Sequence, residues 1–169
     1  MSGVGGGHDS GRDPCAGSSC GTGGSGPRPP KRRVLFLCTG NSARSQIAEA
    51  LVRARWGRRW EAFSAGTRPA GFVHPEAVAV LAEWGISAEG ARSKSVQEFA
   101  GQAFDLVVTV CDQAQEACPV WPGQGRRVHL GFPDPAAVQG PPEAVRAAFR
   151  QVRDGLARRL EEVLGPPDQ

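Results

Sequence analysis

The chain has 169 residues and a formal net charge of +3, a size that suits a single domain. The positive excess is small and forms no concentrated basic stripe, so a small anionic substrate is expected and a nucleic-acid partner is not. No apolar run is long enough to cross a membrane, and the first residues lack the apolar core of a secretory signal. A cytoplasmic protein without a membrane partner is therefore expected.

Residues 1–30 differ from the rest of the chain. Ten of these thirty residues are glycine, and almost none carries a large apolar side chain. Such a stretch buries too little surface to offset the entropy of ordering, so we expect a disordered tail over 1–30 and one catalytic domain over 31–169. Cys15 and Cys20 in the tail are expected to be incidental exposed thiols. The five cysteines form an odd set, which indicates a reducing setting and no disulfide scaffold.

The first strand pattern, residues 33–38, leads into Cys38, and a short polar loop connects it to a helix pattern that begins at Ser45. The backbone N–H groups of such a loop can turn inward and form a concave nest for a tetrahedral anion. The positive end of the following helix adds to the same point. Gly40 and Asn41 are residue types that accept the positive φ that a nest often requires.

Arg44 offers the nest a planar, two-pronged donor for two oxygens of the anion. We expect Cys38 at its base to be a thiolate, because a helix N-terminus and a cation both favour negative charge on sulfur. The hydroxyls of Ser42 and Ser45 are candidates for holding the sulfur or the anion. The alternative is a buried cysteine that ends a core strand. The Gly-Asn pair, the arginine and the helix start together favour a catalytic nucleophile.

The rest of the chain alternates between strand and helix patterns. Further strands are expected at residues 60–64, 104–110 and 126–130, and helices are expected to begin near residues 74, 95 and 141. The predicted fold class is therefore α/β, with three layers and a four-stranded parallel sheet that has helices on both faces. Ligands bind beyond the C-terminal ends of such strands, where Cys38 and Cys111 both fall.

Two later features lie on the same predicted rim. Cys111 and Cys118 are separated by six residues, a spacing at which a disulfide requires local unwinding and favours a redox switch over a structural staple. A metal site is the rival interpretation, but two further ligands at a familiar spacing are missing. Asp134 follows in a proline-flanked loop, where it is a candidate general acid for a leaving oxygen or else an ordinary turn residue.

Four motifs together resemble the thioredoxin-coupled arsenate reductases, which share the fold of the low-molecular-weight protein tyrosine phosphatases. The motifs are Cys38-Thr-Gly-Asn-Ser-Ala-Arg44-Ser45-Gln-Ile-Ala-Glu49, Ser64-Ala-Gly66, Cys111…Cys118-Pro119 and Gly131-Phe-Pro-Asp134-Pro135. The resemblance covers about residues 31–164. The nucleophile loop alone indicates the wider phosphatase fold, whereas the downstream cysteine pair is specific, because a phosphatase needs no resolving thiols.

The resemblance implies a cycle in which Cys38 attacks arsenate and Asp134 protonates the departing oxygen. Cys111 then attacks Cys38 and releases arsenite, Cys118 attacks Cys111, and thioredoxin reduces the resulting Cys111–Cys118 disulfide. The implied substrate contacts are made by the loop residues Thr39, Gly40, Asn41, Ser42, Ala43, Arg44 and Ser45. We expect a monomer with no tightly bound cofactor.

Some relatives also bind a monovalent cation, and Asn41, Glu49 and Ser64 match part of that site. The remaining ligand has no evident counterpart. Ala43 departs from the family, in which many members carry another cysteine, but that cysteine has no part in the relay.

Two other functions compete with the reductase. A phosphatase of the same fold needs only Cys38, Arg44 and Asp134, but phosphotyrosine enzymes of this fold usually place an aromatic residue after the Asp-Pro, where this chain has Ala136 and Ala137. A thiol redox sensor would use the cysteines and would need neither the arginine nor the nest. The sequence favours the reductase.

Overall fold

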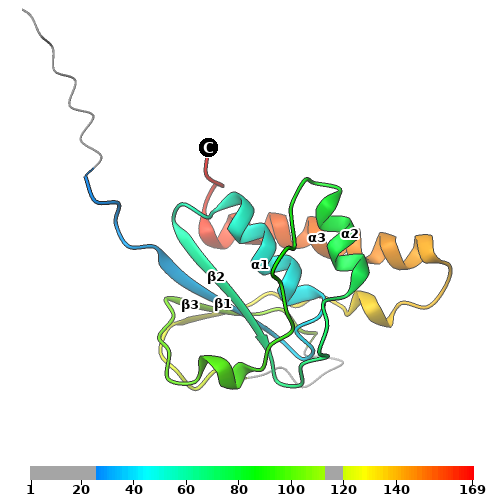
Figure 1. Cartoon of the computed structure of the whole chain (residues 1–169), viewed down its shortest axis with the longest axis horizontal. Coiled ribbons are helices and arrows are strands. Elements are labelled where there is room, and N and C mark those ends of the chain that lie inside the picture. The colour runs from blue at the N-terminus through cyan, green and yellow to red at the C-terminus, as the bar shows by residue number, and fades with distance from the viewer. Residues whose placement is uncertain (1–25, 113–119) are drawn as a thin grey trace, which may run out of the picture.

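A computed structural model of the chain describes residues 26–112 and 120–169 (Figure 1). Its elements are, in chain order, β1 (Arg32–Cys38), α1 (Arg44–Arg55), β2 (Trp60–Gly66), α2 (Pro75–Ala82), the 3₁₀ helix η1 (Val96–Phe99), β3 (Leu106–Thr109), β4 (Arg126–His129), the 3₁₀ helix η2 (Pro135–Ala137) and α3 (Pro142–Leu164). Every expected strand and helix is present, with its ends shifted by a residue or two, and η2 is additional. The expected tail falls largely outside the described residues, so its disorder stays a prediction.

The four strands form one parallel sheet in the order β2-β1-β3-β4. In the central strand, Leu37 is paired with Ala65 of β2 and with Thr109 of β3. The pairing continues past the end of β3, where the N–H of Val110 donates to the carbonyl of Leu37 at 2.9 Å. The chain therefore leaves β1 and β3 at the same edge of the sheet, which is the edge predicted for the site.

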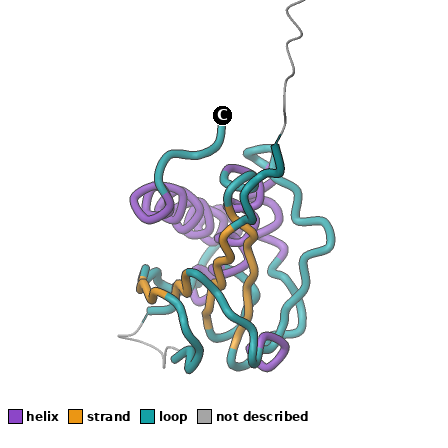
Figure 2. Tube along the Cα trace, turned by 90° about the vertical axis from the view of Figure 1, so that its left-hand side faces the viewer, coloured by secondary structure: helices purple, strands orange, loops and turns teal. Residues whose placement is uncertain are grey.

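The two faces of the sheet are buried in two separate cores, as expected for a parallel sheet. Val34 and Phe36 of β1 point into the larger core, which α1, α2 and α3 cover from one side (Figure 1; Figure 2). Leu35 and Leu37 point into the smaller core on the other face. That core also contains Ala65, Phe99 of η1, Phe104, Val107 and Trp121. The three-layer α/β fold is confirmed, and in the part of the chain that the structure describes, a 3₁₀ helix and loops form the thinner layer.

The long helix α3 buries Phe149, Val152, Leu156 and Leu160, and it ends at Leu164, directly before Gly165. Gly165 has a φ of 84°, a left-handed conformation that glycine adopts without a steric penalty. Its carbonyl accepts a hydrogen bond from the indole of Trp56 at 2.9 Å, which ties the end of α3 to the end of α1. Among the described residues, no helix is long and apolar enough to span a membrane.

Candidate active site

The loop between β1 and α1 turns its carbonyl oxygens outward. Each carbonyl of residues 39–42 accepts a hydrogen bond from a donor that lies outside the loop. The donors are, in order, the N–H of Arg68 at 2.9 Å, the N–H of Ala70 at 2.9 Å, Nε2 of Gln46 at 3.1 Å and the N–H of His74 at 2.9 Å. Because the C=O and N–H of a trans peptide point in opposite directions, the N–H groups of residues 40–43 turn toward the concave side. This arrangement is an anion nest.

Asn41 provides the unusual backbone conformation in this nest. Its φ is 45°, and it is the only non-glycine residue with positive φ in the described part of the chain. Gly40 does not adopt a positive φ, so the turn depends on the asparagine. The N–H of Asn41 lies 3.2 Å from Sγ of Cys38, which places the thiol at the base of the nest.

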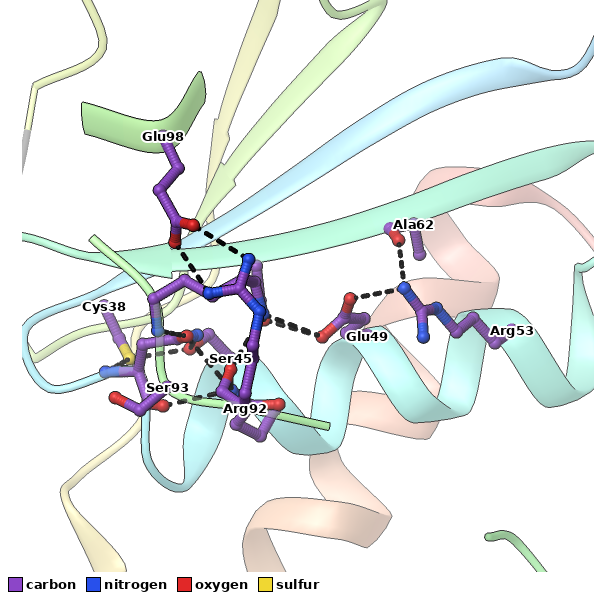
Figure 3. Close-up of polar contacts among 12 residues, drawn as sticks. Cys38, Ser45, Glu49, Arg53, Ala62, Arg92, Ser93 and Glu98 are labelled. Carbon is purple, nitrogen blue, oxygen red and sulfur yellow. Dashed lines mark hydrogen bonds and ion pairs between the residues drawn. The ribbon is translucent and has the colours of Figure 1, made fainter. Parts of the chain in front are cut away.

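The start of α1 faces the same thiol. The N-cap residue, Ala43, makes no side-chain capping bond, and the first turn carries no acidic side chain. No capping side chain therefore occupies the first-turn N–H groups, and their positive end is not neutralised by a carboxylate. Oγ of Ser45, in this first turn, lies 2.8 Å from Sγ of Cys38 (Figure 3).

A chain of hydrogen bonds ends at the sulfur of Cys38, which is only 2% exposed. The backbone N–H of Lys94 donates to Oδ1 of Asn41 at 2.8 Å, which fixes the orientation of the Asn41 amide. Nδ2 of Asn41 then donates to Oγ of Ser45 at 2.8 Å. The Ser45 oxygen is the acceptor in that bond, and in its contact with Sγ of Cys38 either atom can be the donor. The N–H of Asn41 and Oγ of Ser45 therefore both lie within hydrogen-bonding distance of one sulfur.

Arg44 connects the nest to the loop that carries Asp134. The Arg44 side chain is buried, and its Nη1 donates to the carbonyl of Phe132 at 3.0 Å. Asp134 is half-buried, and its Oδ1 accepts the N–H of Ala136 at 3.0 Å, so it caps η2. The structure thus finds the turn role of Asp134. Its second carboxylate oxygen is not part of that bond, and its acid role stays a prediction.

Cys111 lies two residues beyond β3 and is fully buried. It takes part in a disulfide, whereas Cys38 is a free thiol. Cys118 belongs to residues 113–119, which the structure does not describe, so its place in the relay stays a prediction.

Gly66 has a role that the sequence did not indicate. A Cβ at this position would lie 2.5 Å from the carbonyl oxygen of Thr39 and 2.9 Å from the backbone nitrogen of Asn41. Only glycine allows β2 to end directly beneath the nest. The Ser-Ala-Gly motif contains this signal, but its reason is visible only in the fold.

Two of the three side chains proposed for a monovalent cation, Glu49 and Ser64, lie beside the ammonium group of a lysine. Oγ of Ser64 donates to Oε2 of Glu49 at 2.7 Å, so this part of the predicted set is brought together. Nζ of Lys94 lies 3.5 Å from Oγ of Ser64 and 3.9 Å from Oε2 of Glu49. Burial lowers the pKa of Lys94, and the carboxylate of Glu49 opposes that shift. No sequence pattern singled out Lys94.

Comparisons with known proteins identify the family. The family model described as "Low molecular weight phosphotyrosine protein phosphatase" matches residues 33–166. An arsenate reductase of Halalkalibacterium halodurans is 42% identical over 131 residues, which cover 78% of this chain and 94% of the relative. The crystal structure of an arsenate reductase from Archaeoglobus fulgidus matches with a TM-score of 0.61 at 31% identity. The match covers 75% of this chain and 98% of that chain.

A third relative carries the coupling in its name. The thioredoxin-dependent arsenate reductase of Corynebacterium glutamicum has a TM-score of 0.57 at 26% identity, and the match covers 80% of this chain and 63% of that one. The resemblance to thioredoxin-coupled arsenate reductases is thereby confirmed. The chain belongs to the low-molecular-weight phosphotyrosine protein phosphatase family.

Proposed function

We propose that this protein is an arsenate reductase in which Cys38 is the nucleophile and a Cys111–Cys118 disulfide passes the oxidation to thioredoxin. The observation that carries the proposal is a buried free thiol at the base of a loop whose carbonyls at residues 39–42 all point outward. Relatives that match most of this chain are named arsenate reductases, and one of them is named thioredoxin-dependent.

The first step joins sulfur to arsenic. Arsenate binds in the nest, where the inward N–H groups and Arg44 hold its oxygens. The Cys38 thiolate attacks arsenic and forms an S–As bond, while one As–OH group takes a proton from Asp134, its As–O bond breaks, and it leaves as water. Arsenic is still pentavalent after this step, because no electron pair has moved to it.

The second step reduces the arsenic. The Cys111 thiolate attacks Sγ of Cys38, the S–As bond breaks, and its electron pair stays on arsenic, which leaves as trivalent arsenite. A Cys38–Cys111 disulfide results. The shared sheet edge supports this step, since Cys38 ends β1 and Cys111 lies two residues beyond the neighbouring strand β3.

The last steps regenerate the enzyme by thiol–disulfide exchange. The Cys118 thiolate attacks Cys111 and frees the Cys38 thiolate. The dithiol of thioredoxin then reduces the Cys111–Cys118 disulfide, so two electrons from thioredoxin convert one arsenate to one arsenite. The cycle uses the thiols of one chain, in keeping with the expected monomer in a reducing cytoplasm.

An assay of arsenite release with and without thioredoxin and its reductase tests this proposal. We expect many turnovers with the thioredoxin system and at most one per enzyme without it. A phosphatase is the rival, because the same nest can hold a phosphate ester. Brisk hydrolysis of an aryl phosphate together with no arsenite release would reject the reductase.

A further inference from the structure

The carboxylate of Glu49 lies under the nest and is only 5% exposed. A charge buried this deeply is stable only when it is paired and hydrogen-bonded. Its Oε1 pairs with Arg53 at 2.8 Å (Figure 3). Its Oε2 accepts the hydroxyl of Ser64 at 2.7 Å. The Arg53 side chain is 57% exposed, so this pair is partly screened by water. The second positive charge comes from Lys94, which is itself 9% exposed.

Three oxygens surround the ammonium of Lys94. Its Nζ donates to the carbonyl of Arg92 at 2.9 Å, and it lies 3.5 Å from Oγ of Ser64 and 3.9 Å from Oε2 of Glu49. A carbonyl, a hydroxyl and a carboxylate are the kinds of ligand that a monovalent metal ion takes. With the ammonium in place, these residues do not fit an added cation.

Asn41 is not available to such a cation either. Its Oδ1 accepts two N–H groups, from the backbone of Lys94 at 2.8 Å and from Nε2 of Gln46 at 3.0 Å. A carbonyl oxygen has two lone pairs, and both are used here. The structure therefore assigns Asn41 to the nest. The position of the proposed cation is occupied by the ammonium group of Lys94.

The same lysine is joined to the nucleophile through its backbone. Its N–H begins the hydrogen-bond chain that passes through Asn41 and Ser45 to Cys38. The neighbouring Ser93 hydroxyl donates to the carbonyl of Gly40 at 3.0 Å, which fixes another part of the nest. Whatever holds residues 92–94 in place therefore also holds the anion loop in shape.

We propose that Lys94 is a built-in cation: its ammonium takes the place of a monovalent metal ion between Glu49, Ser64 and the Arg92 carbonyl, and so keeps the anion nest formed. Lys94 is a positioning residue, since it acts through Asn41 and Ser45 and contacts no reacting atom. The protein then needs no potassium or sodium to bind an oxyanion. The proposal concerns the anion site that the proposed function uses, but it does not require arsenate reduction.

Two substitutions separate the charge from the space that it fills. Lys94→Ala removes the ammonium and leaves room for a metal ion beside Glu49. Lys94→Met removes the charge but keeps most of the volume, so a metal ion has no room to enter. Lys31→Ala removes the other lysine of the chain, which is exposed ahead of β1, and serves as the matched control for lost charge.

The probe is inorganic phosphate. Its dissociation constant is measured by calorimetry, and the Tm of each protein is measured as well. Both measurements are made in potassium chloride and in choline chloride at equal ionic strength. Wild type and Lys31→Ala should give the same values in both salts. In choline, both Lys94 variants should bind phosphate about tenfold more weakly, which corresponds to the loss of one charged hydrogen bond. Potassium should restore the phosphate affinity of Lys94→Ala to that of the wild type, whereas the phosphate affinity of Lys94→Met should stay weak.

The proposal is overturned if potassium tightens phosphate binding by the wild type, or if Lys94→Ala binds phosphate normally in choline. It is equally overturned if Lys94→Ala is weak and potassium does not restore it. If Lys94→Ala does not fold in choline chloride, folding of this variant in potassium chloride supports the proposal. Failure to fold in both salts rejects it. Failure of arsenate reduction would leave all these phosphate measurements intact, so the two proposals can fail separately.

Discussion

Gly66→Ala should damage the anion nest without touching any reacting group. The added Cβ would lie 2.5 Å from the Thr39 oxygen, 2.9 Å from the Asn41 nitrogen and 3.1 Å from the Asn41 Cβ, whereas ordinary contacts begin at 3.4 Å. Two of these atoms belong to the backbone, so the loop itself has to retreat from β2. Such overpacking costs about 1–3 kcal/mol of unfolding free energy, and a misplacement of about 1 Å at a catalytic site can cost about a hundredfold in rate.

The assay compares Tm, phosphate affinity and kcat/KM for arsenate in Gly66→Ala with those of the wild type. We expect a lower Tm and a disproportionate loss of phosphate affinity and kcat/KM. Gly26→Ala is the control, because a Cβ at Gly26 has no neighbour within 4 Å, and it should change none of the three. The steric argument would be refuted if Gly66→Ala kept its phosphate affinity and its kcat/KM within about twofold of the wild-type values, well short of that hundredfold loss.

Three further predictions test other parts of the molecule. Cys38→Ser and Arg44→Lys should each abolish or cripple turnover, while a normal circular dichroism spectrum shows an intact fold. In Arg44→Lys, lysine keeps the charge but loses the two-pronged geometry. Near-normal turnover in Cys38→Ser would show that Cys38 is not the nucleophile. Deletion of residues 1–30 should leave Tm and turnover nearly unchanged, and a large loss would show that the tail thiols join the relay. The hydrogen bond from Arg150 is the largest of the effects that lower the pKa of Glu83 to about 2 from its usual 4.5. The stability that this pair supplies is therefore present above about pH 4.5 and lost as the pH falls toward 2, so urea unfolding should show a weaker loss of stability in acid for Glu83→Gln than for wild type; an unchanged pH dependence would contradict the pairing.

The fold and the nest were predictable because their signals are local. The residues of β1 are apolar on both faces, which predicts a strand buried between two layers, and Val34 to Leu37 are fully buried. The loop from Cys38 to Arg44 carries its own signal, because a small polar turn that joins a strand to an uncapped helix tends to form an anion nest. The unequal covering of the two faces was not predictable, since a buried strand does not show what covers it.

Lys94 and Gly66 were missed because their roles depend on contacts between distant segments. Lysine is usually solvated, and nothing around Lys94 shows that this residue returns to Asn41, which is 53 positions earlier in the chain. Gly66 has no positive φ to justify a glycine, and only its approach to the backbone of the nest explains it. Gly66 supports the site from the end of β2, and Lys94 supports it from the segment that pairs with that end.

The central claim is the relay from Cys38 through Cys111 to Cys118, and disulfide mapping after one arsenate turnover without reductant tests it most directly. Peptide mass spectrometry should find a Cys111–Cys118 disulfide in the wild type and a Cys38–Cys111 disulfide in Cys118→Ser, because that variant stalls one exchange earlier. Cys111→Ser should release no arsenite unless an external thiol is added. A wild type that emerges with all three thiols free and hydrolyses phosphate esters briskly would contradict the relay.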